Sequence, residues 1–234
     1  HPSSIRNCLE AARNNGRSVR TALTREMWEA LNSTWLEFTA IDPASMGPSK
    51  LPEFLDWVRQ RSAQFRGAML GSLLRDEGFH FAQLGTFTER ADNTARILDV
   101  KYSVLLPANE AIGGERNMHQ WDTILRSVSA TGAYRYFYRQ RFRGRNVAEF
   151  LILRPEMPRS LRFCTDFIAP SLAALASSTG GGAESSALAE ALAADLRAAD
   201  LDRILRGGLH EFLLDFLSRN SAISFALAAD YHFD

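Results

Sequence analysis

Cysteine is scarce in this chain, with only Cys8 and Cys164 among its 234 residues. Neither cysteine belongs to a Cys-x-x-Cys pair, which excludes a disulfide framework and a cysteine zinc site. The nucleophile, Walker A, dinucleotide-binding and zinc-protease motifs are missing too, and no pattern indicates a cofactor. We therefore expect a reduced, cytoplasmic protein without a bound metal or cofactor.

Long apolar runs and an excess of charge are also missing. No stretch of about 18 uninterrupted apolar residues occurs, and residues 1–15 lack the basic and then apolar pattern of a secretory signal, so we expect no membrane segment. Lysine plus arginine equals aspartate plus glutamate at 27 each, which gives no general attraction to nucleic acid. Any anion site must therefore be local. Residue 1 is not methionine, so we expect a chain that is processed or truncated at its amino end.

Helical periodicity is what the sequence has in abundance, together with 46% hydrophobic residues for a core. We predict an all-α bundle of about eight or nine helices that forms one domain over residues 1–234, with a flexible connection at Ser177–Ser186. A short apolar segment follows residue 146, and Pro158 lies near the first turn of the helix after it. The other expected helices are Ser4–Leu23, Thr24–Phe38, Leu51–Leu74, Asp76–Leu106, Met118–Phe142, Ala187–Leu205 and Leu209–Ala228.

The most informative segment is Leu84–Tyr102, because it separates its chemistry between two faces of one helix. At about 100° per residue, one face is mostly apolar; it carries Phe87, Ala91, Thr94, Leu98, Tyr102 and Leu105. The opposite face carries the charged residues Glu89, Asp92, Arg96 and Asp99. That face is either a solvated surface with pairs such as Asp92 and Arg96, or a ligand or interface site.

Arg90 lies at the margin of the apolar face, beside Ile97. We expect its side chain either to reach solvent or to be held by a carboxylate, because an unpaired buried charge costs several kcal/mol. A buried arrangement of glutamate and arginine is therefore one interpretation, and a structural role for Arg90 is favoured.

Glu77 and His80 have the Glu-x-x-His spacing of di-iron bundles. A ferritin-like centre needs a second such pair, and the sequence has none, so we expect hydrogen bonds here rather than a metal site.

Two other segments are basic. Tyr134–Arg145 interleaves arginines with aromatic residues, which suits nucleic acid by composition. On a helix the two kinds separate into a core side and a surface side, so a basic surface for an acidic partner or a phosphorylated ligand is favoured over nucleic acid. Pro158, Arg159 and Ser160 open a helix, where free N–H groups favour an anion, and Arg162 would add charge; a plain helix cap is the alternative.

Several long motifs carry a resemblance to a known family. LGTFTERADNTARILDVKY, WDTILRSVSATGAYRYFYRQ and VAEFLILRPEMPRSLRFC occur in order, preceded by SIRNCLEAARNNGRSVR and RDEGFHF. Together they resemble the alpha-E family, bacterial helical domains named for a Glu-Arg motif. The resemblance maps that motif onto Glu89 and Arg90, and a proline-arginine-serine motif onto residues 158–160. It also implies a further helix before residue 1, which suggests that the amino-terminal part of the family domain is missing.

The resemblance implies a context rather than a reaction. Alpha-E domains typically accompany circularly permuted ATP-grasp proteins, so the first hypothesis is an accessory module that works with an amide or peptide ligase. In it, Glu89, Arg90, Asp92 and Arg96 shape a polar pocket or an interface, and a peptide is the substrate presented. The second hypothesis is an independent transferase or hydrolase with Glu77 or Glu89 as general base and Arg90 or Arg159 holding an anion. A purely structural scaffold is the third.

Overall fold

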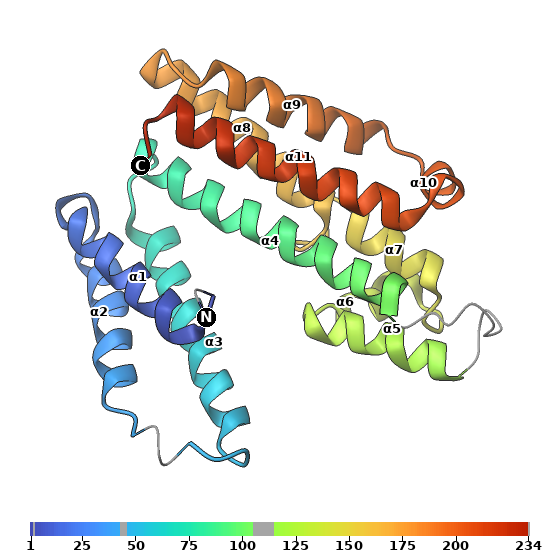
Figure 1. Ribbon diagram of the computed structural model, residues 1–234, viewed down its shortest axis with the longest axis horizontal. Helices are drawn as coiled ribbons and strands as arrows, with labels where there is room; N and C mark the ends of the chain where they lie inside the picture. Colours follow the sequence, from blue (N-terminus) through green and yellow to red (C-terminus); the bar gives the residue numbers. More distant parts are fainter. Residues whose placement is uncertain (2, 43–45, 105–114, 234) are drawn as a thin grey trace. The chain divides into compact units, whose positions relative to one another are not determined.

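The computed structural model describes residues 1, 3–42, 46–104 and 115–233, and within residues 101–104 and 115–118 it describes the backbone alone. Every regular element in this part of the chain is a helix, so the all-α prediction is confirmed (Figure 1). The described helices are somewhat more numerous than the eight or nine expected. Each of them is also too short or too polar to span a bilayer. The chain divides into two compact units, residues 1–79 and residues 80–234.

The first unit consists of three α-helices and a short 3-10 turn, η1. Their bounds are α1 Ile5–Ser18, η1 Arg20–Ala22, α2 Arg25–Thr39 and α3 Leu51–Ser72. Ser4 and Thr24 start α1 and α2, because each hydroxyl accepts a hydrogen bond from the backbone N–H three residues on. Helix α2 packs between the other two. At Gly16 a Cβ atom would lie 2.3 Å from the Leu31 side chain, so only glycine allows α1 to approach α2 this closely.

The second unit contains the remaining helices, the first of which begins three residues before the unit boundary, and one continuous hydrophobic core. Their bounds are α4 Glu77–Val104, α5 Glu115–Ser127, α6 Thr131–Tyr138, α7 Gly144–Ile152, α8 Leu161–Thr179, α9 Ala183–Ala198, α10 Leu201–Gly207 and α11 Leu209–Asp230. Helix α9 packs on both α8 and α11. Helix α4 lies antiparallel to α11, since Asn220 donates to the Thr88 carbonyl at 3.1 Å while His210 contacts Asp99 near the other end (Figure 1).

Two predicted helices are each split in the structure. The expected Met118–Phe142 helix breaks after α5, where Ser129 adopts a left-handed conformation with φ of 55°. The Ala130 N–H then donates to the Leu125 carbonyl at 2.7 Å and closes the helix end. The expected Ala187–Leu205 helix breaks at Asp200, whose carboxylate caps α10. These two breaks account for the additional helices.

Two other boundaries differ from the prediction. Helix α8 begins at Leu161 with Ser160 as its N-cap, so Pro158 precedes the helix instead of lying in its first turn. Within Ser177–Ser186, only Gly180–Gly182 lie outside helices, and Gly180 and Gly182 have positive φ angles. These glycines form the turn between α8 and α9, and the flexibility of this connection stays a prediction.

Candidate functional site

Helix α4 has the two faces that its sequence predicts. Phe87, Ala91, Thr94 and Leu98 are buried, with exposed fractions between 0% and 7%. Phe87 stacks on Phe167 of α8 with ring centroids 4.6 Å apart. The remaining two predicted core residues, Tyr102 and Leu105, lie outside the described side chains. The buried face anchors α4 in the core and directs its charged face outward.

The charged face begins with Glu89 and the Asp92–Arg96 pair. Glu89 is exposed and accepts a hydrogen bond from Asn93 at 3.1 Å. Arg96 donates through Nε and Nη2 to the two oxygens of Asp92, at 2.6 and 3.0 Å, which confirms the predicted pair. The hydrogen bond to Asp92 raises the pKa of Arg96. The Arg96 side chain is 62% exposed, so the pair contributes only about 0.3–0.5 kcal/mol and leaves the guanidinium accessible.

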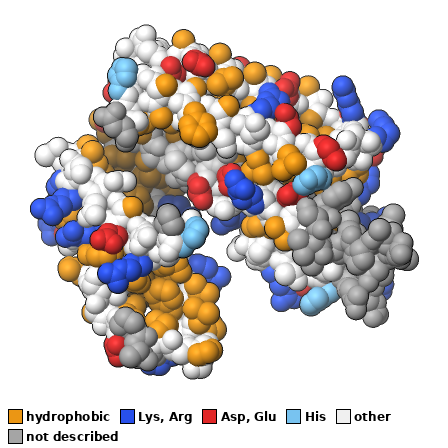
Figure 2. Space-filling view, viewed as in Figure 1, with side chains coloured by type: hydrophobic (Ala, Val, Ile, Leu, Met, Phe, Trp, Pro, Cys, Tyr) orange, Lys and Arg blue, Asp and Glu red, His pale blue; other side chains and the backbone are white. Residues whose placement is uncertain are grey.

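At the other end of this face, Asp99 contacts a residue that the sequence did not single out. The Asp99 Oδ1 atom lies 2.5 Å from Nδ1 of His210 at the start of α11. This hydrogen bond raises the pKa of His210, and the charges of Asp99 and Glu211 act in the same direction against desolvation. The two residues are 111 positions apart, so no local spacing indicated the contact. Figure 2 shows acidic, basic and histidine side chains gathered over the face that α4 and α11 share.

Arg90 takes a structural position. It is half-buried, its Nη1 atom donates to the Pro158 carbonyl at 3.1 Å, and its guanidinium lies 4.9 Å from the centroid of the Phe87 ring. Because Glu89 is exposed, the buried arrangement of Glu89 with Arg90 is not present. Arg90 instead fastens α4 to the segment that leads into α8.

Ser160 is fully buried, and its hydroxyl has two partners. It accepts from the Phe163 N–H at 3.0 Å as the N-cap of α8 and donates to the Arg154 carbonyl at 2.6 Å. This helix start is therefore capped by its own serine. Arg162 does not add charge to an anion site here, because it faces Asp166 at 3.8 Å, which Arg197 also contacts at 2.7 Å.

Cys164 lies one turn further along α8, and the charges of two arginines affect its pKa. It is fully buried, and burial raises the pKa of its thiol to about 12, while the positive charges of Arg90 and Arg159 act in the opposite direction. The charges of both guanidinium groups therefore act on one thiol. We call the set Arg90, Pro158, Arg159, Ser160 and Cys164 the motif joint, because two sequence motifs far apart in the chain meet there.

Glu77 is not brought into this group. It is exposed in the first turn of α4 and belongs to the first unit, whereas Glu89 and Arg90 belong to the second. His80 is half-buried. Among the described residues, no three histidine, cysteine, aspartate or glutamate side chains are grouped closely enough to hold a metal ion.

In the Tyr134–Arg145 segment, aromatic and basic residues separate only in part, because Tyr136 is 81% exposed and Phe137 is 39% exposed. Tyr134 is buried and packs on Tyr138, Phe142 and Phe150, while its arginines face solvent.

Comparison with known proteins decides the family. A family model named Alpha-E, described as a predicted alpha-helical domain with a conserved ER motif, matches residues 1–232. The chain belongs to the Alpha-E family. No curated protein and no solved structure shows significant similarity to it.

The Alpha-E chain contains two Glu-Arg dipeptides, at residues 89–90 and 115–116. The second lies among residues whose side chains are not described. At the first, the two residues face different surroundings: Glu89 faces solvent and Arg90 enters the motif joint. The Glu-Arg dipeptide of this Alpha-E domain therefore combines a structural arginine with an accessible carboxylate.

Proposed function

We propose that this Alpha-E domain is an accessory helical module that works with an ATP-grasp amide or peptide ligase. The charged face of α4, formed by Glu89, Asp92, Arg96 and Asp99, is the surface that binds the ligase or presents its peptide substrate. One observation carries the proposal: Glu89 and Arg96 are exposed on this face and Asp92 and Asp99 are partly exposed, while the opposite face is buried and Arg90 contacts the segment before α8. The family resemblance supplies the ligase context.

The chemistry of the face suits this role. An ATP-grasp ligase activates a carboxylate as an acyl phosphate, which an amine then attacks. A helper that presents either reactant needs a guanidinium for the carboxylate or a carboxylate for the amine. Arg96 and Glu89 provide these groups on one exposed surface. An incoming carboxylate replaces Asp92 on Arg96 at low cost, because an exposed pair of this kind is weak.

A second candidate function, that of an independent transferase or hydrolase, has one observation in its favour. The Asp99 carboxylate holds Nδ1 of His210, the arrangement that orients an imidazole as a general base. This second function requires that the purified domain alone turns over a peptide or amide substrate, and that the His210→Gln variant loses this turnover. A purely structural scaffold requires Glu89, Arg90 and Arg159 in a dry core. Glu89 is exposed and both arginines are half-buried, so the scaffold has less support.

The test is co-purification with the ATP-grasp protein, using a charge-swapped face. The double variant Asp92→Arg with Arg96→Asp retains two opposite charges at i and i+4 but reverses the field that a partner meets. We expect it to weaken association at least tenfold. The matched control is Arg25→Glu with Glu29→Arg, which swaps another exposed i,i+4 pair on α2 and should leave association within about twofold.

Two results contradict the proposal. One is failure of the wild-type domain to associate with the ligase, combined with ligase activity that does not change when the domain is removed. The other is equal weakening by both charge swaps, which would assign the effect to folding or to general charge.

A further inference from the structure

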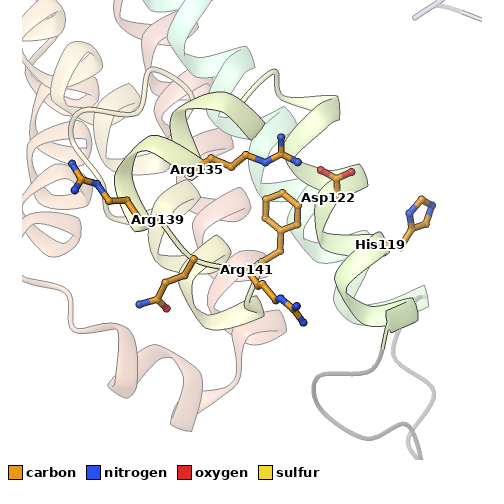
Figure 3. A pocket seen from close by; sticks show the side chains of 7 residues that line it. His119, Asp122, Arg135, Arg139 and Arg141 are labelled. Atoms are coloured by element: carbon orange, nitrogen blue, oxygen red, sulfur yellow. The ribbon is translucent and has the colours of Figure 1, made fainter.

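A cavity of about 590 Å³ opens between α5, α6 and the loop before α7, in the basic segment that the proposed function does not use (Figure 3). Its lining includes His119, Asp122, Arg135, Arg139, Arg141 and Phe142. This volume lies within the range of about 300–1,000 Å³ that is typical of small-molecule sites. Three of the lining residues are arginines, and one is an acid.

The loop that forms one wall of the cavity is held in place by the core. The Tyr134 hydroxyl donates to the Arg141 carbonyl at 3.4 Å and accepts from the Arg143 N–H at 3.3 Å. Arg139 ends α6 in a left-handed conformation with φ of 50°, which turns the chain into this loop. At Gly144, where α7 starts, a Cβ atom would lie 2.8 Å from the Trp121 ring. The wall is therefore formed before any ligand binds.

The cavity arginines differ from others in the same unit in their partners. Arg145 pairs with Asp202 at 2.8 Å, Arg126 pairs with Asp122 at 2.7 Å, and Arg154 pairs with Glu149 at 2.5 Å. Within the part of the chain that the structure describes, Arg135, Arg139 and Arg141 form no ion pair with a carboxylate. Among the described residues, no ion pair therefore neutralises these three arginines.

Two of the three arginines face the cavity. In Figure 3, Arg135 extends toward Asp122 on one side, Arg141 lies on the other side, and Arg139 is turned away. The Arg135 guanidinium lies 5.5 Å from the centroid of the Phe142 ring, and this contact with the aromatic face fixes its position. Arg135 and Arg141 are therefore the principal cationic groups, and Arg139 is a peripheral one.

Asp122 adds a requirement for the ligand. The residue is 9% exposed, and its Oδ2 atom accepts from Arg126. Its Oδ1 atom is buried and has no hydrogen-bond partner among the described residues. A buried acceptor of this kind requires a donor. A ligand that places a hydroxyl beside its anionic group satisfies Asp122 and the arginines together.

We propose that this cavity binds a small phosphorylated ligand, with the phosphate held by Arg135 and Arg141 and a neighbouring hydroxyl donating to Asp122. Guanidinium groups bind phosphate oxygens in bidentate fashion, and a phosphate dianion matches two cations better than a single carboxylate does. The volume of about 590 Å³ is that of a small-molecule site, so we assign the cavity to a small molecule in preference to an acidic polypeptide. This site is separate from the charged face of α4 and does not depend on the proposed function.

The experiment is a set of binding titrations of the whole chain by calorimetry and by amide NMR shifts. Glucose 6-phosphate supplies a phosphate with hydroxyls, inorganic phosphate supplies the anion alone, and a tetraglutamate peptide supplies carboxylates. We expect saturable binding that is tightest for glucose 6-phosphate, with shifts confined to α5, α6 and the following loop. Affinity should fall as salt rises.

Single glutamine variants locate the site. Arg135→Gln and Arg141→Gln should each weaken binding about tenfold, since each removes a charge-assisted hydrogen bond. Arg139→Gln should have a smaller effect, about threefold. The matched control is Arg145→Gln, an arginine of the same segment whose partner is Asp202, and it should change affinity less than twofold. Because Arg135 packs on Phe142, Arg141→Gln is the decisive variant, with an unchanged melting temperature as its folding check.

Three results overturn the inference. The first is titration without saturation at millimolar concentrations of both phosphate ligands. The second is a loss in Arg145→Gln as large as that in Arg141→Gln, which would indicate general charge attraction. The third is tighter binding of tetraglutamate or of a short oligonucleotide than of glucose 6-phosphate.

Discussion

At the motif joint, the Arg90 guanidinium is held by the Pro158 carbonyl and the Phe87 ring, close to a buried thiol. At the cavity between α5 and α6, Arg135 and Arg141 lie around an open space and form no ion pair among the described residues. Both regions belong to the second unit, and both are rich in arginine. The two regions differ in which groups surround the guanidinium.

This difference shows that the groups in contact with a guanidinium determine the role of the arginine. A guanidinium that donates to a backbone carbonyl of its own chain stabilises the fold, and its removal leaves that carbonyl without this donor. A guanidinium that faces a cavity without a carboxylate remains available to an anion from outside. The arginine of the family motif, Arg90, accordingly has a structural role. The arginines that remain available to a ligand belong to the basic segment.

The largest expected effect is the difference in stability between two alanine variants, one from each region. Arg90→Ala should lower the free energy of unfolding by about 1.5–3 kcal/mol, because it removes a charged hydrogen bond to the Pro158 carbonyl and the contact with Phe87. Arg141→Ala should change it by less than about 0.5 kcal/mol, as an exposed substitution does. Urea unfolding followed by circular dichroism measures both. Equal losses would remove the distinction between the two regions.

A smaller effect is expected at the serine of the motif joint. Ser160→Ala should cost about 2 kcal/mol in urea unfolding, because the change removes both the cap of α8 and the hydrogen bond to the Arg154 carbonyl. Ser4→Ala is the matched control, since Ser4 caps α1 with the same geometry but is only partly buried. It should cost about 0.5–1 kcal/mol. A cost at Ser160 no larger than that at Ser4 would show that the joint adds nothing to an ordinary cap.

The smallest expected effect is the pH dependence of the contact between Asp99 and His210. The pKa of His210 is raised in the folded state, so the contact stabilises the fold fully below the unfolded value of about 6.5. This stabilisation is lost as pH rises through the folded pKa. Asp99→Asn should therefore lower the melting temperature at pH 5.5 and change it little at pH 9.

The control for this pH effect is His119→Gln, which removes an exposed histidine at the cavity and should leave both melting temperatures unchanged. An NMR titration of His210 gives the pKa directly. A melting temperature that falls equally at both pH values in Asp99→Asn would show that the contact does not depend on the charge of His210. The contact between Asp99 and His210 would then stabilise the fold equally at both pH values.

The features that the sequence predicted well are local. The two faces of α4 follow from helical periodicity, and Asp92 and Arg96 pair because residues four apart are neighbours on a helix. The burial of Tyr134 and the exposure of the arginines in Tyr134–Arg145 follow for the same reason. Periodicity also placed Arg90 at the margin of the core, where it lies.

The features that could not be predicted depend on distant residues or on unusual backbone conformations. Ser129 ends α5 with a left-handed conformation that glycine usually provides, so no residue type marked this break. The partner of Arg90 is a backbone carbonyl 68 positions away, and a carbonyl leaves no signature in the sequence. His210 meets Asp99 only because α11 returns antiparallel to α4.

Because Cys164 is buried, its reaction with a thiol reagent reports local unfolding of the chain. With a pKa of about 12, the Cys164 thiol is almost entirely protonated at neutral pH and is shielded from reagents, whereas Cys8 is exposed. A maleimide dye therefore labels the native chain at Cys8 alone. Slow labelling of the second thiol then measures how often the core around Cys164 opens, without any engineered cysteine.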